Sequence, residues 1–133
     1  MAAKSKHLST VINRPSSAVY EYAADPANLP RWAAGLASTT VERVEAQWVA
    51  DSPMGRVTIS FAAHNDFGVL DHVVTLPSGE SVHNPLRVIP YEDACEVVFT
   101  LRQRPGMSDD EFARDAESVR ADLHSLKRIL EAV

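Results

Sequence analysis

The sequence predicts an α+β domain in which a curved antiparallel sheet of about six or seven strands wraps around a long C-terminal helix, with two short helices after the first strand. Two observations carry this prediction. Residues 108–133 hold an apolar stripe with helical spacing, and short β-rich runs separated by turn residues fill the chain from residue 39 to residue 104. The gaps between these runs are too short for crossover helices, so we expect antiparallel pairing.

The N-terminal part predicts one strand followed by two short helices. Residues 7–13 alternate loosely between apolar and polar side chains, as a strand does. Pro15 suits the start of a helix, and the apolar spacing behind it stops near Asp25. A second, irregular helical piece is expected over 26–36, with Gly35 near its end.

Five β-rich runs follow the short helices. The first of them can divide into two strands near Gln47, which gives the expected total of six or seven. Pro85 lies inside a later run, and a proline has no N–H to donate to a strand ladder. We therefore expect a bulge or a sheet edge there. The runs are 39–52, 55–64, 68–76, 81–91 and 95–104.

The C-terminal helix has the clearest signals in the chain. Ser108 and Glu111 have the spacing of a capping box, and the acidic residues of the first turn complement the helix dipole. The stripe could also form a coiled-coil seam, but it spans only about three heptads. Since the chain offers its own sheet, packing within the chain is favoured. The stripe consists of Phe112, Ala116, Val119, Leu123, Leu126, Leu130 and Val133.

Length, composition and charge limit the classes of function. A chain of 133 residues with 45% hydrophobic and 23% charged residues is expected to form a single domain, 1–133. Its net charge of −5 argues against a general nucleic-acid or anionic-membrane surface. No apolar segment is long enough to span a membrane, so no membrane insertion and a cytoplasmic location are expected. The single cysteine, Cys95, fits a reducing compartment. The expected oligomeric state is a monomer or a homodimer.

Cofactor and metal chemistry lack their usual signatures. The five glycines are scattered singly, without a phosphate-binding or dinucleotide fingerprint, and no serine-nucleophile motif occurs. The five histidines form no H-x-H or H-E-x-x-H pair. We therefore expect no cofactor, no metal site, and an inert thiol at Cys95.

The order of the segments and several local motifs resemble one superfamily. The anchors are Ile12-Asn13-Arg14-Pro15-Ser16, Asn28-Leu29-Pro30-Arg31-Trp32, Pro53-Met54-Gly55, and the helix residues Asp122-Leu123 and Leu126-Lys127. Together they resemble the START/Bet v 1-like superfamily, also called SRPBCC or polyketide cyclase/dehydrase-like, with its helix-grip fold. The segment Phe67-Gly68-Val69-Leu70-Asp71-His72 looks like a bacterial branch of it.

The resemblance implies a cavity between the sheet and the long helix that holds a hydrophobic or aromatic small molecule. Family members include lipid and hormone carriers, aromatic-polyketide cyclases and co-chaperones of the Hsp90-activator type. We therefore consider a binding or carrier protein first. The alternatives are a cyclase or dehydratase-like enzyme and an Hsp90-activator-like interaction protein, because fold alone does not determine function.

His72 and Arg87 are the weak candidates for chemistry. In a strand, Leu70 and His72 share one face and Asp71 points to the other, so Asp71 and His72 cannot both face inward. A cavity-facing His72 could exchange a proton near neutral pH, although a wall residue is the more common case. Arg87 could stabilise an oxyanion inside the cavity or form a cross-strand ion pair with an acid such as Asp71 on the solvent face.

Large apolar side chains complete the expected site. Trp32 suits either a core plug or a ligand wall. Phe61, Phe67, Phe99 and Trp48 lie in or beside the β region, and most of them are expected in the core, with Phe99 beneath the long helix. The residues expected to contact a ligand are Trp32, Phe61, His72, Arg87, Phe99 and Leu123.

Overall fold

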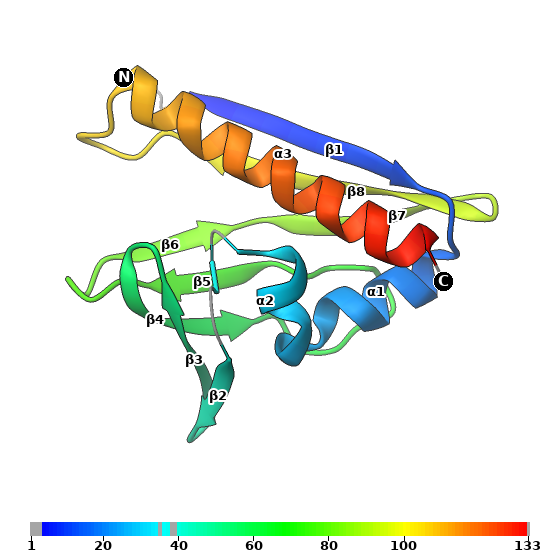
Figure 1. Cartoon of the computed structure of the whole chain (residues 1–133), viewed down its shortest axis with the longest axis horizontal. Helices are drawn as coiled ribbons and strands as arrows, with labels where there is room; N and C mark the ends of the chain where they lie inside the picture. Colours follow the sequence, from blue (N-terminus) through cyan, green and yellow to red (C-terminus); the bar gives the residue numbers. More distant parts are fainter. Residues whose placement is uncertain (1–3, 35, 38–39, 133) are drawn as a thin grey trace.

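The computed structural model describes residues 4–34, 36–37 and 40–132 (Figure 1). Its order of elements is a strand, short helices, a long β region and a C-terminal helix, as the sequence predicts. The elements are β1 (Ser5–Ile12), α1 (Ser16–Ala24), the 3-10 helix η1 (Pro26–Asn28), α2 (Leu29–Trp32), β2 (Val41–Val44), β3 (Gln47–Ser52), β4 (Gly55–Phe61), β5 (His72–Thr75), β6 (Ser81–Asn84), β7 (Leu86–Tyr91), β8 (Ala94–Arg102) and α3 (Asp109–Glu131).

The strands form two antiparallel sheets, which corrects the expectation of one curved sheet of six or seven strands. One sheet has the order β1-β8-β7 and the other has the order β2-β3-β4-β5-β6. The chain passes from one sheet to the other at Pro85, between β6 and β7. Pro85 has no N–H for a ladder, while its carbonyl still accepts a hydrogen bond from Thr100 N at 3.0 Å. The division of the sheet therefore follows from the residue that the sequence marked as a bulge or an edge.

A short segment before β5 joins the two sheets. Leu70 N donates to Leu86 O, and Val88 N donates to Gly68 O, each at 2.8 Å. Gly68 has a positive φ of 73°, and a Cβ at this position would collide with the carbonyl oxygen of Val88. Only glycine therefore permits this close approach to β7.

The N-terminal helices begin where their residues predict. Pro15 precedes α1, and the Asp25 side chain accepts a hydrogen bond from Ala27 N at 3.0 Å, where η1 begins. The second helical piece is shorter than the expected 26–36, because η1 and α2 together end at Trp32. Gly35, expected near its end, lies outside the described residues.

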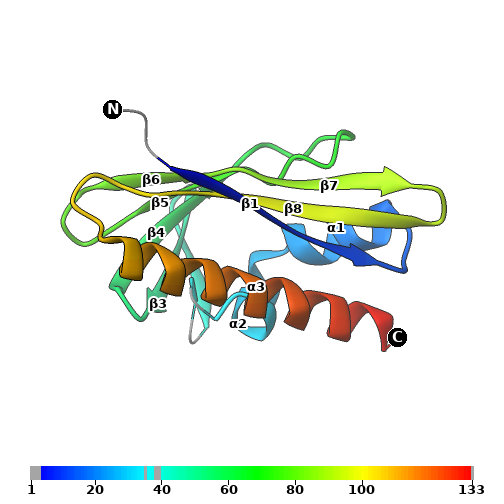
Figure 2. The ribbon, with the colours of Figure 1, turned by 90° about the horizontal axis from the view of Figure 1, so that it is seen from above.

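The apolar stripe of α3 packs against β1 and β8, and Figure 2 shows the helix running along these strands. Both hydrogen bonds of the capping box between Ser108 and Glu111 are present, which confirms the predicted helix start. Val119 is half-buried, and Val133 lies outside the described residues. Within the described part of the chain, no helix has the length and apolar character needed to cross a membrane. The buried stripe residues are Phe112, Ala116, Leu123, Leu126 and Leu130.

Phe67, which the sequence places in or beside the β region, lies outside the core. Phe67 is 82% exposed, at the tip of the loop between β4 and β5. The Asn65 side chain holds this loop, since its Oδ1 accepts from Phe67 N at 2.9 Å and from Val69 N at 3.1 Å. The local turn thus directs Phe67 to solvent despite its apolar character.

A charge in the stripe of α3 is expected to unfold the domain. Leu126 is fully buried, so Leu126→Glu places a carboxylate without a partner in the core and should lower the free energy of unfolding by about 4 kcal/mol or more. Urea denaturation followed by circular dichroism measures this loss. Ala121→Glu is the control because Ala121 is exposed on the same helix. Equal stability of the two variants would contradict the packing of α3.

Candidate ligand-binding site

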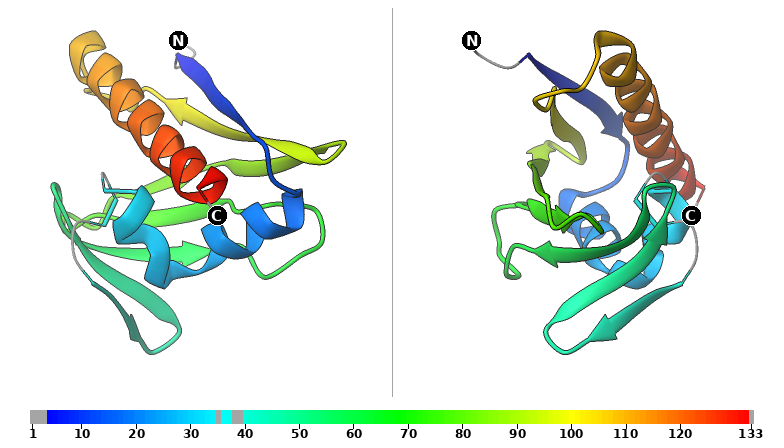
Figure 3. Two further views of the ribbon diagram at one scale, coloured as in Figure 1. Left: turned by 45° about the vertical axis from the view of Figure 1, so that its right-hand side comes forward. Right: turned by 90° about the vertical axis from the view of Figure 1, so that its left-hand side faces the viewer.

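A cavity of about 590 Å³ lies between α3, α2 and the inner face of the five-stranded sheet. Figure 3 shows α3 and the five-stranded sheet on opposite sides of the molecule. Side chains alternate along a strand, so one face of β5 and one face of β8 point inward and contribute to the cavity walls. Since β8 belongs to the three-stranded sheet, both sheets contribute to the walls. Its size lies within the usual range for small-molecule sites, roughly 300–1,000 Å³.

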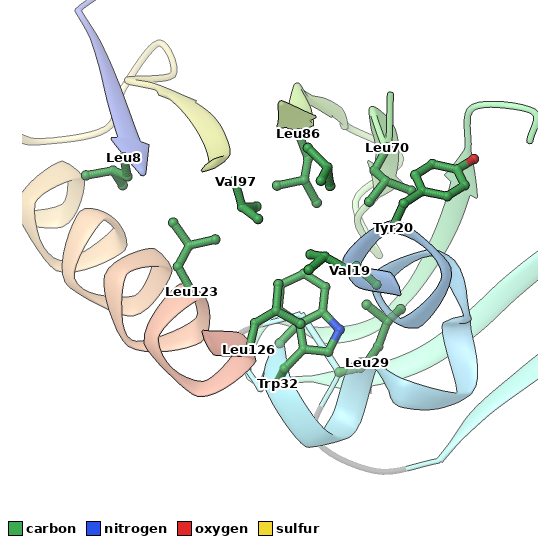
Figure 4. Packing of buried hydrophobic residues seen from close by; sticks show 14 of the residues in the cluster. Leu8, Val19, Tyr20, Leu29, Trp32, Leu70, Leu86, Val97, Leu123 and Leu126 are labelled. Atoms are coloured by element: carbon green, nitrogen blue, oxygen red, sulfur yellow. The ribbon is translucent and has the colours of Figure 1, made fainter. Parts of the chain in front are cut away.

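One part of the cavity wall is apolar and rich in rings. Trp32 on α2 is 6% exposed, and Figure 4 shows its ring among buried side chains from α1, α2 and α3. The indole Nε1 has no hydrogen-bond partner among the described residues, so apolar packing holds the ring. The apolar wall residues are Leu29, Trp32, Ala33, Leu36, Phe61, Val74, Leu86, Phe99, Leu101, Val119 and Leu123.

Another part of the wall is polar and charged. Arg104, in the loop before α3, forms an ion pair with Glu80 at 2.9 Å and joins this loop to the turn between β5 and β6. Asp115 on α3 also lines the cavity, and partial burial raises the pKa of its carboxyl while nearby Arg104 opposes this shift. The sequence analysis missed this polar region. Its only signal was the pair of arginines, Arg102 and Arg104, at the end of the last β-rich run.

His72 is the one polar or charged side chain in the buried class among the described residues, with 5% of its surface exposed. It lies on β5 and lines the cavity. Its ring centroid is 5.2 Å from that of Phe61 and 6.3 Å from that of Phe99. Burial lowers the pKa of His72; its bond to Leu70 and the charge of Asp71 oppose this shift, and His83 adds to it. The ring is therefore neutral at neutral pH.

Asp71 and Arg87 meet on the opposite, outer face. Arg87 Nε donates to Asp71 Oδ1 at 2.8 Å, and Nη2 donates to Oδ2 at 2.7 Å. This bidentate pair lowers the pKa of Asp71 and raises that of Arg87. Asp71 Oδ1 also accepts from Leu86 N at 3.0 Å, so one carboxylate binds both the backbone and a side chain where β7 begins.

The structure brings together five of the six residues expected to contact a ligand. Trp32, Phe61, His72, Phe99 and Leu123 line the cavity. Arg87 is absent from the lining, since its half-exposed side chain is bound to Asp71 outside. Contact of Arg87 with a ligand in this cavity therefore has no support from the lining.

The geometry also bears on the enzyme hypothesis. The enzyme hypothesis requires His72 to move a proton while Arg87 stabilises an oxyanion on the same ligand. His72 lines the cavity, whereas Arg87 is outside its lining and bound to Asp71, so the two side chains do not converge on the cavity. In the described part of the chain, no group of three His, Cys, Asp or Glu side chains is arranged to hold a metal ion. Cys95 is fully buried, and burial raises the pKa of its thiol, which disfavours the reactive thiolate.

Comparison with known families agrees with the fold and the cavity. The profile of one family, described as polyketide cyclase / dehydrase and lipid transport, matches residues 6–131. The chain belongs to this family. This match confirms the resemblance to the START/Bet v 1-like superfamily. No curated protein matches the sequence.

Solved structures share the fold at low sequence identity. The ZhuI aromatase/cyclase from Streptomyces sp. R1128 superposes with a TM-score of 0.70 and 14% identity, covering 98% of this chain and 94% of that one. Ara h 8.0201 gives a TM-score of 0.70 at 11% identity, with 99% and 100% covered. XoxI from Bacillus cereus gives 0.74 at 13% identity, with 97% and 95% covered. At these identities the likeness concerns the fold alone.

The buried neutral His72 predicts that acid weakens the fold. In the unfolded chain a histidine has a pKa of about 6.5, above its lowered value in the folded protein. As pH falls below about 6.5, the unfolded state binds a proton that the folded state does not, so the free energy of unfolding decreases. Urea denaturation at several pH values from 7.5 to 5.5 measures the free energy of unfolding. This free energy should decrease less steeply with falling pH in His72→Phe than in the wild type. His124→Ala, on an exposed position of α3, is the control; a wild-type slope in His72→Phe would refute the assignment.

The Asp71 carboxylate is expected to stabilise the junction of the two sheets. Asp71→Ala leaves Leu86 N and the Arg87 guanidinium without their acceptor and should lower the free energy of unfolding by about 1–3 kcal/mol. Chemical denaturation measures the change. Glu117→Ala removes an exposed ion pair with Arg120 on α3 and should cost less than about 1 kcal/mol. A loss in Asp71→Ala no larger than in this control would contradict the role.

Proposed function

We propose that this chain binds a hydrophobic or aromatic small molecule in the cavity between α3 and the five-stranded sheet. The cavity itself carries the proposal, because a volume of about 590 Å³ within a domain of this size accommodates a ligand with several rings. An Hsp90-activator-like role, in which side chains fill the interior, finds no support in a cavity of this size.

The composition of the wall indicates an amphipathic ligand. Rings and aliphatic side chains would contact the apolar body of the ligand, and the Arg104–Glu80 region would contact a polar substituent or the surrounding water. Family membership and the aromatase/cyclase among the structural relatives support the same class of ligand. Trp32, Phe61, His72, Phe99 and Leu123 are the proposed contact residues.

The proposal places the binding function in a cytoplasmic protein with a single core. The free, buried Cys95 fits a reducing compartment. Helices and both sheets contribute to one hydrophobic cluster, which supports one binding unit rather than two.

Native mass spectrometry of gently purified protein, followed by denaturation of the same sample, tests for a bound small molecule. In parallel, the uncharged probe N-phenyl-1-naphthylamine should bind with a fluorescence increase at its own emission wavelength. Val119→Trp fills the cavity from α3 and should weaken probe binding at least about tenfold, the equivalent of about 1.4 kcal/mol.

Ala121→Trp adds the same ring at an exposed position of α3 outside the cavity and should bind the probe like the wild type. Thermal melting of both variants establishes that they are folded. Absence of a native ligand together with absence of probe binding would overturn the proposed function. Equal probe affinity in the two variants would place the binding site elsewhere.

A further inference from the structure

His72 lines the cavity among both aromatic and polar side chains, and the polar ones beside it on β6 are His83 and Asn84. The described residues that neighbour its ring in the cavity include Phe61 and Phe99, which offer ring surfaces rather than hydrogen-bond partners. The ring nitrogen that carries the hydrogen donates a hydrogen bond, and the other nitrogen can only accept one. The position of that hydrogen therefore decides which ligand group His72 can bind.

The hydrogen bond to Leu70 settles which nitrogen carries the proton. His72 Nδ1 lies 3.0 Å from the backbone oxygen of Leu70. A carbonyl oxygen can only accept, so Nδ1 must donate and must carry the hydrogen. In a neutral ring, Nε2 then has a lone pair and no hydrogen. Burial favours that neutral ring.

Nε2 has no hydrogen-bond partner among the residues that the structure describes, since the Leu70 carbonyl is the partner given for this side chain and it binds Nδ1. The charged group nearest in sequence, Asp71, points to the outer face and is bound by Arg87 and Leu86. His83, which lies across from Val73 in the β5–β6 ladder, has a side chain that is 56% exposed. Asp71 does not line the cavity. His83 and Asn84 do line it, Asn84 as the residue opposite His72 in the β5–β6 ladder, but in the described part of the chain neither is hydrogen-bonded to His72.

We propose that Nε2 of His72 accepts a hydrogen bond from a hydroxyl group of the ligand, so that the site selects phenols and enols over their ethers. The inference rests on the proposed function, because it names the substituent that the same cavity recognises. His72 is here a specificity-determining residue.

The alternatives to a hydroxyl match this wall less well. An ether or ketone oxygen has only lone pairs, so it would face the lone pair of Nε2 without a hydrogen between them. A carboxylate would add a negative charge beside a neutral ring in an apolar setting, which has a large desolvation cost. A hydroxyl supplies the missing hydrogen and leaves the Leu70 hydrogen bond intact.

A matched pair of probes tests the proposal. 2-Naphthol and 2-methoxynaphthalene share one ring system, and only the first can donate a hydrogen bond. Isothermal titration calorimetry at pH 7.5 should give wild-type protein a Kd for 2-naphthol about threefold to tenfold below that for 2-methoxynaphthalene, the range of a typical net hydrogen bond. In His72→Phe the two Kd values should converge, with 2-methoxynaphthalene bound as well as before. His124→Ala should keep the wild-type ratio.

The outcomes separate this inference from the proposed function. If both probes bind the wild type equally, the selectivity for a hydroxyl is overturned while binding of aromatic molecules stands. If neither naphthalene probe binds while N-phenyl-1-naphthylamine does, the selectivity for a hydroxyl is overturned and the proposed function stands. An unchanged ratio in a folded His72→Phe would also overturn the role of His72.

A measurement on the wild-type protein keeps the proposal testable if His72→Phe fails to fold. Nitrogen-15 NMR of labelled histidine distinguishes a protonated from an unprotonated ring nitrogen. The free protein should show His72 protonated at Nδ1 alone, and 2-naphthol should shift the Nε2 resonance while 2-methoxynaphthalene leaves it in place. A proton on Nε2 in the free protein would overturn the proposal.

Discussion

The burial of the α3 stripe against β1 and β8 is the constraint on which the rest of the structure depends. A helix with one continuous apolar face must cover apolar surface, and this helix covers the three-stranded sheet. The five-stranded sheet then faces the helix at a distance that the short helices and side chains only partly fill. The cavity is thus a consequence of where the helix packs, and its ring-rich wall follows from the inner faces of β4, β5 and β8.

The second constraint is the junction between the sheets at Pro85. The chain leaves one sheet and enters the other at this residue, and the loop around Gly68 spans the junction with backbone hydrogen bonds. Asp71 adds a bidentate bond to Arg87 and a bond to Leu86 N at the same place. Asp71 and His72 are consecutive residues, so their side chains point to opposite faces of the sheet. Asp71 stabilises the junction on the outer face, and His72 lines the cavity.

The same fold is built by very different sequences. The structural relatives share the fold at only 11–14% sequence identity. In this chain the wall combines rings, one neutral imidazole and a polar region tied by Arg104 and Glu80. These residues, rather than the fold, limit what the cavity can hold.

Local patterns by themselves determined the elements of this protein. The Ser108–Glu111 capping box and the α3 stripe were readable because they depend on residues three or four positions apart, and the alternation around His72 depends on neighbours. The cavity wall could be predicted in part, because the chain has few large apolar residues that could face inward. Tertiary structure alone decided that Pro85 divides the sheet in two and that Arg87 binds Asp71 outside the cavity. It also decided that Glu80 meets Arg104 beside the cavity. These outcomes depend on contacts between residues far apart in the chain, and no local spacing records such contacts.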